Sequence, residues 1–369
     1  MGNMLMRSHD FLFFVDSFRL GGVLFRILTL PKNRPVALGF FVNDAERGVH
    51  FALCPNATFI RINFPRPRRG WSSVRFTRLL KRLASLTANR EVVVIVWGYR
   101  DLRTLGVDVC SFFERCWRVE RALIEPPAAS GNAFVVGYRS IYFDGRTSTD
   151  WEAQLNALTP GELSRSVEGK YLLSHILGAG LSKYSGTAPD VRLTERDLLI
   201  VGQCTGDQAI EYTDAMARSN VELVDLVVKC LLKNGHSFEK IYYKPHPKNR
   251  TTPADIACIQ DRYPEIDIID GNAAIVPLLI GKPTVATLTS GVGLEAAVRG
   301  CKVHTFGISF YSHWGFTFDH MPCSRRTNRL SAEDVLLFAL IHQTRYVNPK
   351  TKRPIGALAA FGLTAAEQD

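Results

Sequence analysis

Residues 284–319 read TVATLTSGVGLEAAVRGCKVHTFGISFYSHWGFTFD, and the order of residue types predicts a β-turn-α-β unit. Residues 284–288 form a β-branched apolar run, which is typical of a buried strand. The small residues 289–293 suit a tight turn, residues 294–299 a helix, and residues 302–306 the next strand. Backbone N–H groups and a serine hydroxyl then meet the positive end of a helix, where phosphate binds well. An ordinary turn without a ligand is the alternative.

The length and charge of the chain limit the possible classes of protein. With 369 residues, two domains are expected. The net charge of +10 indicates an anionic partner: a nucleotide, an acidic polymer, a phospholipid surface or nucleic acid. Nucleic acid is not expected, since no helix-turn-helix and no repeated aromatic-basic pattern is present. The apolar run Phe11–Val15 is too short to span a membrane, so no transmembrane segment is expected.

The eight cysteines are scattered and contain no CxxC pair or zinc-like Cys/His spacing. We therefore expect reduced thiols in a cytoplasmic protein, and no metal site. Their positions are 54, 110, 116, 204, 230, 258, 301 and 323.

The first part of the chain shows an α/β pattern. Apolar runs at residues 36–42, 92–97 and 119–124 predict buried parallel strands, and helical spacing over residues 74–86 predicts an amphipathic helix. The basic segment Arg66–Trp71 fits a solvated loop, or a contact with an anionic acceptor or a membrane surface.

The middle of the chain contains a predicted hairpin and a predicted linker. Residues 134–136 and 140–143 are short apolar runs that suggest a hairpin, and residues 151–185 suggest helices. The break at Gly186–Asp190, which contains glycine, threonine and proline, is the best candidate for a linker.

The second half alternates strands and helices more clearly. Strands are predicted at residues 198–202, 241–243 and 266–269, and a helix at residues 221–233. This spacing predicts a parallel, doubly wound sheet, which binds ligands at the carboxyl ends of its strands. Neither GxGxxG nor GxxxxGK[ST] occurs, so a dinucleotide oxidoreductase and a P-loop NTPase are not expected.

Three polar clusters follow strands of this predicted sheet, at residues 203–207, 244–246 and 289–295. Each has a structural alternative: Asp207 could cap a helix, and Glu295 could only complement a helix dipole. The two prolines around His246 could only stiffen the exit from a strand. Their joint position at the strand ends of one sheet nevertheless favours a binding site.

These motifs resemble a known family. Pro245-His246-Pro247, followed by the segment TSGVGLEAAVRGCKVHTFG and then FYSHWGFT, resembles the capsular polysaccharide biosynthesis family. Within it, the retaining β-Kdo glycosyltransferase modules of group 2 capsule linkers are the most similar. Further segments agree in chain order: residues 140–144 (SIYFD), 181–184 (LSKY), 203–207 (QCTGD), 325–327 (RRT) and 345–349 (RYVNP).

The chain also departs from the family pattern. The acids that usually precede the SIYFD segment are replaced by Gly137-Tyr138-Arg139. The QCTGD segment resembles the family's DQTxGD segment, but Gly202 stands where that segment has its first acid. The EDGF-type segment is absent from residues 119–125, and the first 130 residues match poorly. The resemblance therefore says more about donor and chemistry than about acceptor and linkage.

The resemblance implies a GT-B fold, in which two Rossmann-like domains face each other across a cleft and C-terminal helices cross back. We expect an acceptor domain at residues 1–188, a nucleotide-sugar donor domain at 189–330, and C-terminal helices and tail at 331–369. One such helix is predicted at residues 331–343 with Ser331 as its N-cap.

The resemblance also assigns roles to individual residues. It implies Asp207 as the nucleophile of a double displacement, with His246 assisting departure of CMP. The donor would contact a larger set: Gln203, Lys244, Thr289, Ser290, Gly291, Glu295, Tyr311 and Trp314. The sugar carboxylate or the acceptor would contact Asp144, Arg146 and Lys183. No metal or other cofactor is expected, because basic groups and helix N-termini hold the donor phosphate in such enzymes.

The function so implied is transfer of β-Kdo from CMP-β-Kdo to a glycan or glycolipid acceptor with retention. Two alternatives remain: a CMP-sialic acid transferase, and a catalytically inactive module that binds glycan or lipid. The expected location is the cytoplasm, with peripheral attachment to the inner membrane surface and contacts with capsule-assembly proteins.

Overall fold

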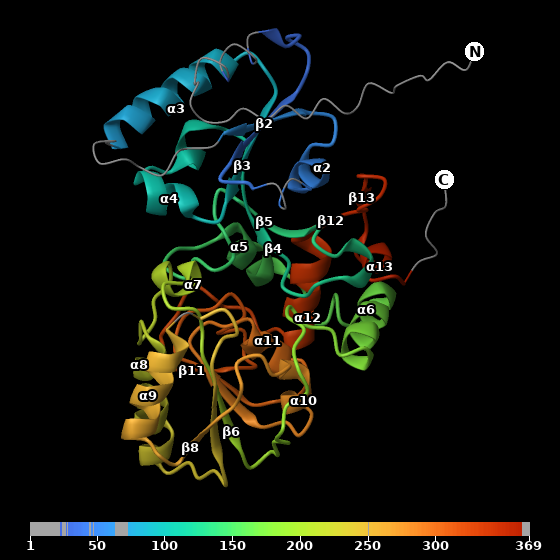
Figure 1. The fold of residues 1–369 in the computed structure, drawn as a ribbon. Helices are drawn as coiled ribbons and strands as arrows, with labels where there is room; N and C mark the ends of the chain where they lie inside the picture. The colour runs from blue at the N-terminus through green and yellow to red at the C-terminus, as the bar shows by residue number, and fades with distance from the viewer. Residues whose placement is uncertain are drawn as a thin grey trace, which may run out of the picture. The chain divides into compact units, whose positions relative to one another are not determined.

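The computed structural model describes residues 23, 27, 29–43, 46, 48–62, 73–249 and 251–363. The predictions for Phe11–Val15 and Arg66–Trp71 lie outside these residues. The chain divides into two compact units, coloured by residue number in Figure 1. Unit 1 contains Met1–Glu120 and Val347–Pro354, and unit 2 contains Arg121–Tyr346 and Ile355–Asp369. We describe each unit by itself.

Unit 1 contains four parallel strands in the order β4-β3-β1-β2. They are β1 (Val36–Phe40), β2 (Thr58–Ile62), β3 (Val92–Trp97) and β4 (Cys116–Arg121). The centre of the sheet is apolar along its length, as expected for parallel strands covered on both faces. Helix α3 (Ser73–Thr87) packs Leu80 and Leu83 into the core of these strands. The predicted strands at 36–42 and 92–97 and the predicted helix at 74–86 are confirmed.

A buried ion-pair network surrounds Arg118, in the middle of β4. Arg118 has no exposed side-chain surface, and its guanidinium donates to the carboxylates of Asp101 at 2.8 Å and Asp108 at 2.6 Å. The same guanidinium lies 4.4 Å from the centroid of the Tyr99 ring. Arg118 lies just before the apolar run predicted at residues 119–124, and these contacts provide the partners that a buried charge needs.

The expectation of reduced cysteines is wrong at one pair. Cys110 and Cys116 form a disulfide within unit 1, and their Cα atoms lie 5.3 Å apart. The fold explains the pairing: Cys110 lies in the short helix η2 (Val109–Phe112), and the chain then returns to start β4 at Cys116. A spacing of six residues gave no motif from which to predict the bond.

Unit 2 contains a six-stranded parallel sheet with the order β11-β10-β9-β6-β7-β8. Its strands are β6 (Leu198–Val201), β7 (Ile241–Lys244), β8 (Ile266–Ile268), β9 (Thr284–Thr287), β10 (Val303–Thr305) and β11 (Phe318–Asp319). The order reverses between β6 and β9, which makes this a doubly wound sheet. The predicted strands at 198–202, 241–243, 266–269, 284–288 and 302–306 are confirmed.

Two separate cores cover the two faces of this sheet. Helix α8 (Asn220–Cys230) packs Leu223, Val224 and Val227 on one face. Helices α10 (Ile275–Leu279) and α11 (Val292–Ala297) cover the other face with Leu278, Leu279 and Ala296. Helix α9 (Thr252–Arg262) adds Ile259 to the first core. Helices on both faces bury the central strands β6, β9 and β10 completely, which is why these strands read as continuous apolar runs.

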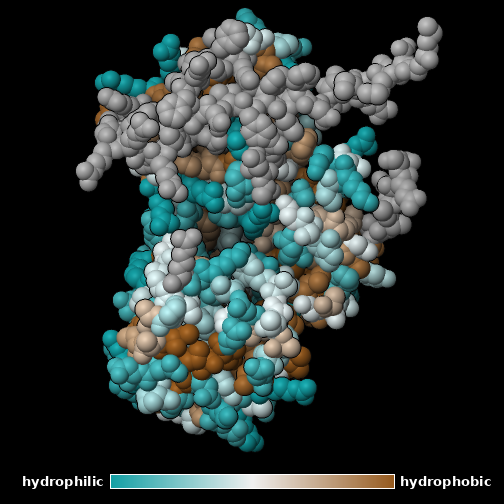
Figure 2. Space-filling model, viewed as in Figure 1, coloured by the Kyte–Doolittle hydropathy of each residue, from teal (hydrophilic) through white to brown (hydrophobic). Residues whose placement is uncertain are grey.

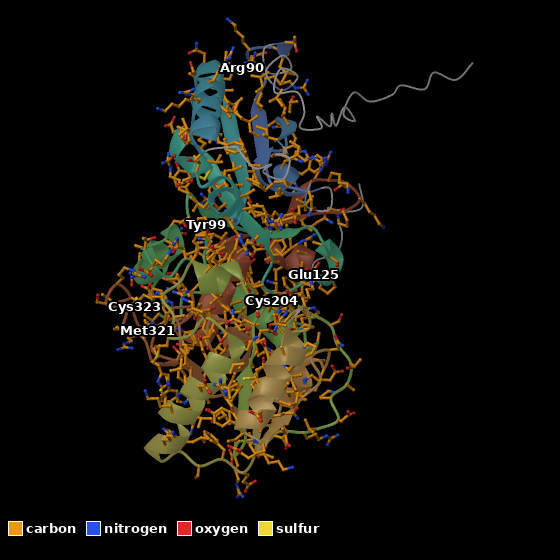
Figure 3. The ribbon with its side chains drawn as sticks, turned by 60° about the vertical axis from the view of Figure 1, so that its left-hand side comes forward. Arg90, Tyr99, Glu125, Cys204, Met321 and Cys323 are labelled. Atoms are coloured by element: carbon orange, nitrogen blue, oxygen red, sulfur yellow. A yellow bond between two sulfur atoms is a disulfide. The ribbon has the colours of Figure 1, made fainter. Side chains whose placement is uncertain are left out.

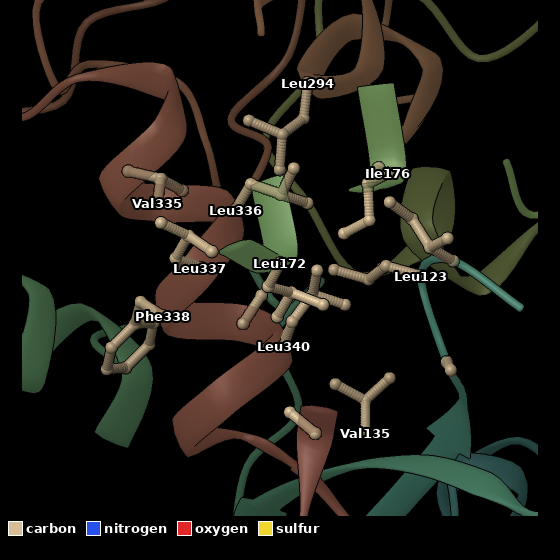
Figure 4. Packing of buried hydrophobic residues seen from close by; sticks show 14 of the residues in the cluster. Leu123, Val135, Leu172, Ile176, Leu294, Val335, Leu336, Leu337, Phe338 and Leu340 are labelled. Carbon is tan, nitrogen blue, oxygen red and sulfur yellow. The ribbon is translucent and has the colours of Figure 1, made fainter. Parts of the chain in front are cut away.

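The rest of unit 2 forms a third core (Figure 4). Figure 4 shows side chains from distant segments converging there, among them Leu123, Leu172, Ile176, Leu294 and Leu336. Its helices are α5 (Asp150–Ala157), α6 (Val167–Gly178), α12 (Ala332–Leu337) and the π-helix η5 (Phe338–His342). Ser331 caps α12 by accepting from the N–H of Asp334, which confirms the predicted helix and its cap.

This core explains why the compact units divide at Glu120 and not at the predicted boundary near residue 188. Leu123, Leu172 and Ile176 belong to the same cluster as Leu294, so residues 121–188 pack as part of unit 2. Sequence composition marks flexible breaks such as Gly186–Asp190, but the sharing of a core by distant segments leaves no local signal.

The predicted hairpin is wrong. Strand β5 (Ala133–Tyr138) pairs antiparallel with β12 (Thr344–Val347), and residues 140–143 form turns. The Asp144 N–H donates to the Ile141 carbonyl at 3.0 Å, which closes one of these turns. The strand predicted at 119–124 lies at Cys116–Arg121 instead, because its apolar end turns away to enter the third core.

The remaining described elements are α2 (Val49–Leu53), α4 (Arg100–Leu105), η3 (Pro127–Ala129), α7 (Gln208–Glu211), η4 (Leu232–Asn234), β13 (Pro354–Ile355) and α13 (Ala357–Ala360).

On the visible face of unit 2, hydrophobic side chains gather over the β11 end of the sheet, where Phe318 is 52% exposed (Figure 2). Within the described residues, no helix has both the length and the apolar character that crossing a membrane requires.

Candidate functional site

The site is built around the turn that follows β9. Strand β6 pairs in parallel with β9, and Gln203, which follows β6, forms hydrogen bonds with this turn. Its Oε1 accepts from the Thr289 N–H at 2.8 Å, and its Nε2 donates to the Thr289 hydroxyl at 3.1 Å. Gln203 and Thr289 are both buried, so both polar groups of the amide are used within the protein. The two predicted donor-binding residues therefore fix the backbone that presents Ser290 and Gly291.

A second buried amide, which the sequence reasoning missed, holds Gln203 in turn. Asn220 Oδ1 accepts from the Gln203 N–H at 2.9 Å, while its Nδ2 donates to the Gln203 carbonyl at 3.1 Å. The same Nδ2 lies 2.8 Å from a carboxylate oxygen of Asp255. Asn220 begins a helix, where a polar residue is common, so its sequence context gave no sign of this role.

Lys244 ends β7 and is buried except for about 5% of its surface. Its ammonium donates to the Gly271 carbonyl at 2.8 Å. Burial lowers the pKa of Lys244 to about 8, although the nearby Asp270 carboxylate acts in the opposite direction. A buried lysine that forms no ion pair is costly, and an anionic ligand beside it would reduce that cost.

His246 is held as a neutral hydrogen-bond donor. Its Nδ1 accepts from the Lys248 N–H at 3.1 Å and lies 3.2 Å from the Cys204 sulfur. Since the backbone N–H can only donate, Nδ1 is the unprotonated nitrogen and the ring proton lies on Nε2. The pKa of His246 is lowered to about 4, mainly by burial and also by the charges of Lys183, Lys244 and Lys248, while Asp207 acts in the opposite direction. Cys204 lies just beyond the end of β6 (Figure 3).

Three lysines therefore act electrostatically on one neutral imidazole. Lys183 and Lys244 were predicted site residues, but Lys248 was not. The ammonium of Lys248 lies 4.8 Å from the centroid of the Tyr184 ring, whose edge faces His246 with 5.5 Å between the ring centroids. The tract Lys244-Pro245-His246-Pro247-Lys248 could have suggested Lys248, because two prolines restrict where its side chain points.

Glu295 lies in the first turn of α11 and is buried. Among the described residues, its Oε2 has no hydrogen-bond partner. Burial raises the pKa of Glu295, while a hydrogen bond with Ser182 and the charges of Arg299 and Lys183 lower it. A buried carboxyl oxygen without a partner is unusual in proteins, and a ligand with hydroxyl or N–H donors would satisfy it. We call Lys183, Lys244, His246, Lys248 and Glu295 the His246 cluster.

Asp207 acts as an N-cap in the structure. Its Oδ1 accepts from the Ala209 N–H at 3.1 Å at the start of α7. Its charge also acts on His246, where it raises the imidazole pKa against the stronger effect of burial. The carboxylate is only half-buried, so the cap does not remove it from solvent. The capping alternative is present in the structure, and the nucleophile assignment stays a prediction.

Asp144 and Arg146 form an ion pair with each other. The Arg146 guanidinium donates to the Asp144 carboxylate at 3.0 Å and lies 4.6 Å from the centroid of the Tyr212 ring. Tyr212 follows the last turn of α7, whose first turn Asp207 caps. Of the predicted set, Lys183 is the residue whose charge acts on both His246 and Glu295.

Tyr311 and Trp314 lie in the third core with no exposed surface. The Tyr311 hydroxyl donates to the Ser290 carbonyl at 2.6 Å, and Trp314 Nε1 donates to the Phe310 carbonyl at 2.9 Å. The prediction that they contact the donor directly has no support in this arrangement, because both side chains are enclosed by protein. Tyr311 instead supports the turn at Ser290 from behind.

Among the described residues, no group of three or more His, Cys, Asp or Glu side chains is arranged to hold a metal ion. The described cluster offers three ammonium groups, a neutral imidazole donor and an unpartnered carboxyl oxygen. This set of groups suits an anion that carries hydroxyl groups nearby, such as a sugar phosphate.

Comparisons with known proteins agree with this description. Residues 183–348 match the family model of the capsule polysaccharide biosynthesis proteins. The lipopolysaccharide-processing protein LpsZ of Rhizobium meliloti is 27% identical over 334 residues, which are 85% of this chain and 71% of the relative. The capsule polysaccharide modification protein LipA of Neisseria meningitidis serogroup B is 31% identical over 316 residues. That match covers 80% of this chain but 42% of LipA, so the chain spans less than half of this relative.

Two solved structures share the fold. Thermosulfurimonas dismutans KpsC, a beta Kdo 2,7 transferase, matches with a TM-score of 0.65 and 20% identity, over 89% of this chain and 98% of that one. The beta Kdo 2,4 transferase of the same organism matches with a TM-score of 0.63 and 19% identity, over 89% and 97%. The fold is thus α/β, with two sheets of mostly parallel strands. Residues 183–348, which contain the His246 cluster, are therefore similar to the capsule polysaccharide biosynthesis proteins.

Proposed function

We propose that this protein is a glycosyltransferase of surface polysaccharide synthesis that transfers β-Kdo from CMP-β-Kdo to a glycan or glycolipid acceptor. The observation that carries the proposal is the His246 cluster, which combines phosphate-binding groups with the unpartnered carboxyl oxygen of Glu295. The likeness in fold to two beta Kdo transferases supports the donor class. The proposed arrangement is GT-B, with the donor bound at the strand ends of unit 2.

In this proposal, the CMP phosphate lies beside Lys244, His246 and Ser290. The Nε2–H of His246 and the ammonium of Lys244 meet the negative charge that grows on the phosphate as CMP leaves. Glu295 accepts from ribose hydroxyls through its Oε2, the atom without a protein partner. Lys183 pairs with the Kdo carboxylate, since Arg146 is already held by Asp144. These basic groups meet the charge of the donor, so no metal ion is needed.

The proposed reaction is a double displacement at the anomeric carbon. The carboxylate of Asp207 attacks the anomeric carbon while the bond between this carbon and the phosphate oxygen breaks. The electron pair of the broken bond leaves with CMP. An acceptor hydroxyl then displaces the carboxylate of Asp207 and passes its proton to water or to a base. Two inversions give net retention of the β-configuration. We place this reaction at the cytoplasmic face of the inner membrane, where acceptor and capsule-assembly proteins would be the partners.

Calorimetry with CMP tests the donor site. We expect His246→Ala and Ser290→Ala each to weaken CMP binding about tenfold or more, because each removes a hydrogen bond to a charged phosphate. His342→Ala, at an exposed histidine outside the cluster, is the control and should bind like the wild type. If both site variants keep wild-type affinity, the donor site is misplaced.

Release of CMP from CMP-Kdo and from CMP-sialic acid, measured separately with a chelator present, tests the reaction. The proposal expects turnover with CMP-Kdo that the chelator leaves unchanged. Turnover with CMP-sialic acid alone would establish the sialic acid alternative. Binding of CMP without turnover of either donor, against a panel of glycan and glycolipid acceptors, would support the inactive binding module.

A further inference from the structure

The positive charge of the protein is concentrated in unit 1. By sequence, unit 1 contains 22 of the 45 lysine and arginine residues but only 9 of the 35 aspartate and glutamate residues. Unit 1 therefore carries a formal charge of +13 and unit 2 a charge of −3. No acidic residue occurs anywhere between Glu46 and Glu91. The functional site of unit 2 does not account for this asymmetry, because its anionic ligand would bind in the acidic unit.

Helix α3 (Ser73–Thr87) presents part of this charge on one face. Phe76, Leu80 and Leu83 are buried, and the last two belong to the core of unit 1. The opposite face exposes Arg78, Lys81 and Arg82. Residues three and four apart lie together on a helix, so these cations form a stripe that we call the α3 stripe.

The α3 stripe is not neutralised within the described part of the protein. Arg78, Lys81 and Arg82 form no ion pair with any described residue. Other arginines of unit 1 are used, as Arg90 donates to the carbonyls of Pro31 and Leu30 and Arg115 pairs with Glu91. Three exposed cations on a rigid helix therefore remain available to an external anion.

We propose that the α3 stripe docks unit 1 on an anionic lipid surface. The stripe lies on the convex outside of a single helix, and Figure 1 shows α3 along the outer side of the strands of unit 1. A convex row of charges suits a broad, flat anionic surface better than a single sugar or phosphate, which binds in concave sites. Since the apolar face of α3 is already buried in the core, attachment is electrostatic and reversible.

The charge asymmetry also favours binding through unit 1. An anionic surface attracts unit 1, which carries α3, and repels the slightly acidic unit 2. This inference deepens the membrane location proposed above. It depends on the charges alone, and vesicle binding is measured without donor or acceptor, so failure of one proposal leaves the other standing.

Co-sedimentation of the full chain with vesicles tests the proposal. We compare vesicles of mixed phosphatidylcholine and phosphatidylglycerol with vesicles of pure phosphatidylcholine. Each basic side chain near an anionic surface contributes about fivefold to binding, so the variant Arg78→Gln/Lys81→Gln/Arg82→Gln should bind about a hundredfold more weakly. Each single variant should lose about fivefold, which guards against misfolding of the triple variant. Wild-type binding should also fall as salt is added.

The matched control is Lys170→Gln/Lys229→Gln/Lys233→Gln, which makes the same change in net charge at exposed positions of unit 2. It should bind the anionic vesicles within about twofold of the wild type. An equal loss in control and α3 variants would overturn the proposal, since net charge alone would then explain binding. So would equal binding to both kinds of vesicle, or α3-dependent binding to duplex DNA without binding to vesicles.

Discussion

Asp207 shows how one side chain can satisfy a structural and a chemical requirement at once. Its Oδ1 accepts from the Ala209 N–H, which fixes the carboxylate at the start of α7. The capping contact uses one of the two carboxyl oxygens, and the group is half-exposed. A nucleophile must be held in place and remain accessible, so the cap is compatible with the proposed role.

Changing Asp207 to Asn and to Ser separates the two roles. Both replacements cap a helix about as well as Asp, so we expect the free energy of unfolding to change by less than about 0.5 kcal/mol. If Asp207 is the nucleophile, CMP release from CMP-Kdo should fall by about a thousandfold or more in both, with CMP affinity nearly unchanged. Mass spectrometry of the wild type should find the sugar adduct on the peptide that contains Asp207. If the Asp207→Asn variant were active, Asp207 would not be the nucleophile, and its role would be to cap α7.

Cys204 has a predicted role as a positioning residue for His246. The Lys248 N–H already donates to Nδ1, so the Cys204 thiol is a second donor to the same nitrogen. Two donors at Nδ1 stabilise the neutral ring and keep its proton on Nε2. Burial also raises the pKa of Cys204, which keeps it a thiol and hence a donor.

Nitrogen NMR of the imidazole tests this role without any need for activity. In the wild type, the His246 ring should stay neutral between pH 5 and pH 8 with its proton on Nε2, because its pKa is about 4. Cys204→Ala removes a donor that favours the neutral form, so the pKa of His246 should rise. Cys204→Ser keeps a donor and should behave like the wild type. A wild-type ring that titrates near pH 6.5, or carries its proton on Nδ1, would contradict the assignment.

At the scale of the element, the turn between β9 and α11 depends on a close contact behind it. The Tyr311 hydroxyl donates to the Ser290 carbonyl at 2.6 Å, and Gly293 leaves the space for it. A Cβ atom on Gly293 would lie 2.1 Å from that hydroxyl oxygen. Gly291, two residues earlier, has no atom within 4 Å of its Cβ position. Tyr311 and Gly293 therefore act together to fix the position of Ser290.

Gly293→Ala should destabilise unit 2 by about 1–3 kcal/mol in urea unfolding, because the added methyl group overpacks a buried contact. Gly291→Ala is the matched control and should change stability by less than about 0.5 kcal/mol, since its Cβ meets open space. Adding Tyr311→Phe to Gly293→Ala removes the hydroxyl and should recover part of the loss. Equal stability of the two alanine variants would show that the contact does not constrain the turn.

The sequence was informative where a single element carries its own pattern. Strands β6, β7 and β9 are buried on both faces, so they read as apolar runs, and the polar residues after them converge as the strand-end rule predicts. Strand β2 was missed because Arg61 and Thr58 interrupt its short apolar pattern. Strand β12 was missed for the same reason, since it begins Thr344-Arg345.

The site was predictable only in part, for a related physical reason. Lys244, His246 and Glu295 follow recognisable turns and could be named from the sequence. Asn220 holds Gln203 across 17 residues, and Tyr311 holds Ser290 across 21, through hydrogen bonds that depend on packing. Such contacts have no local signature. Burial of Tyr311 and Trp314 in a shared core likewise depends on helices far away in the sequence.

At the scale of the whole molecule, buried histidines make unit 2 sensitive to acid. His304 in β10 is buried, and its Nδ1 lies 3.1 Å from Nε2 of His320. The pKa of His304 is lowered to about 4, mainly by burial and also by His320, His236 and Lys302, while Asp319 acts in the opposite direction. His246 has a pKa of about 4 for similar reasons. In the unfolded chain both would titrate near the ordinary value of about 6.5.

The folded pKa values lie below the unfolded ones, so the unfolded chain binds more protons between pH 6.5 and pH 4. Stability is therefore complete above about pH 6.5 and lost as the pH falls toward 4, by up to about 1.4 kcal/mol per pH unit for each histidine. Urea unfolding at pH 7 and pH 5, followed by hydrogen exchange in unit 2, measures this loss. His304→Gln should reduce the slope by about one proton, whereas His342→Gln, at an exposed site, should leave it unchanged. Equal slopes in the wild type and the His304 variant would mean that His304 is already protonated or exposed in the folded protein.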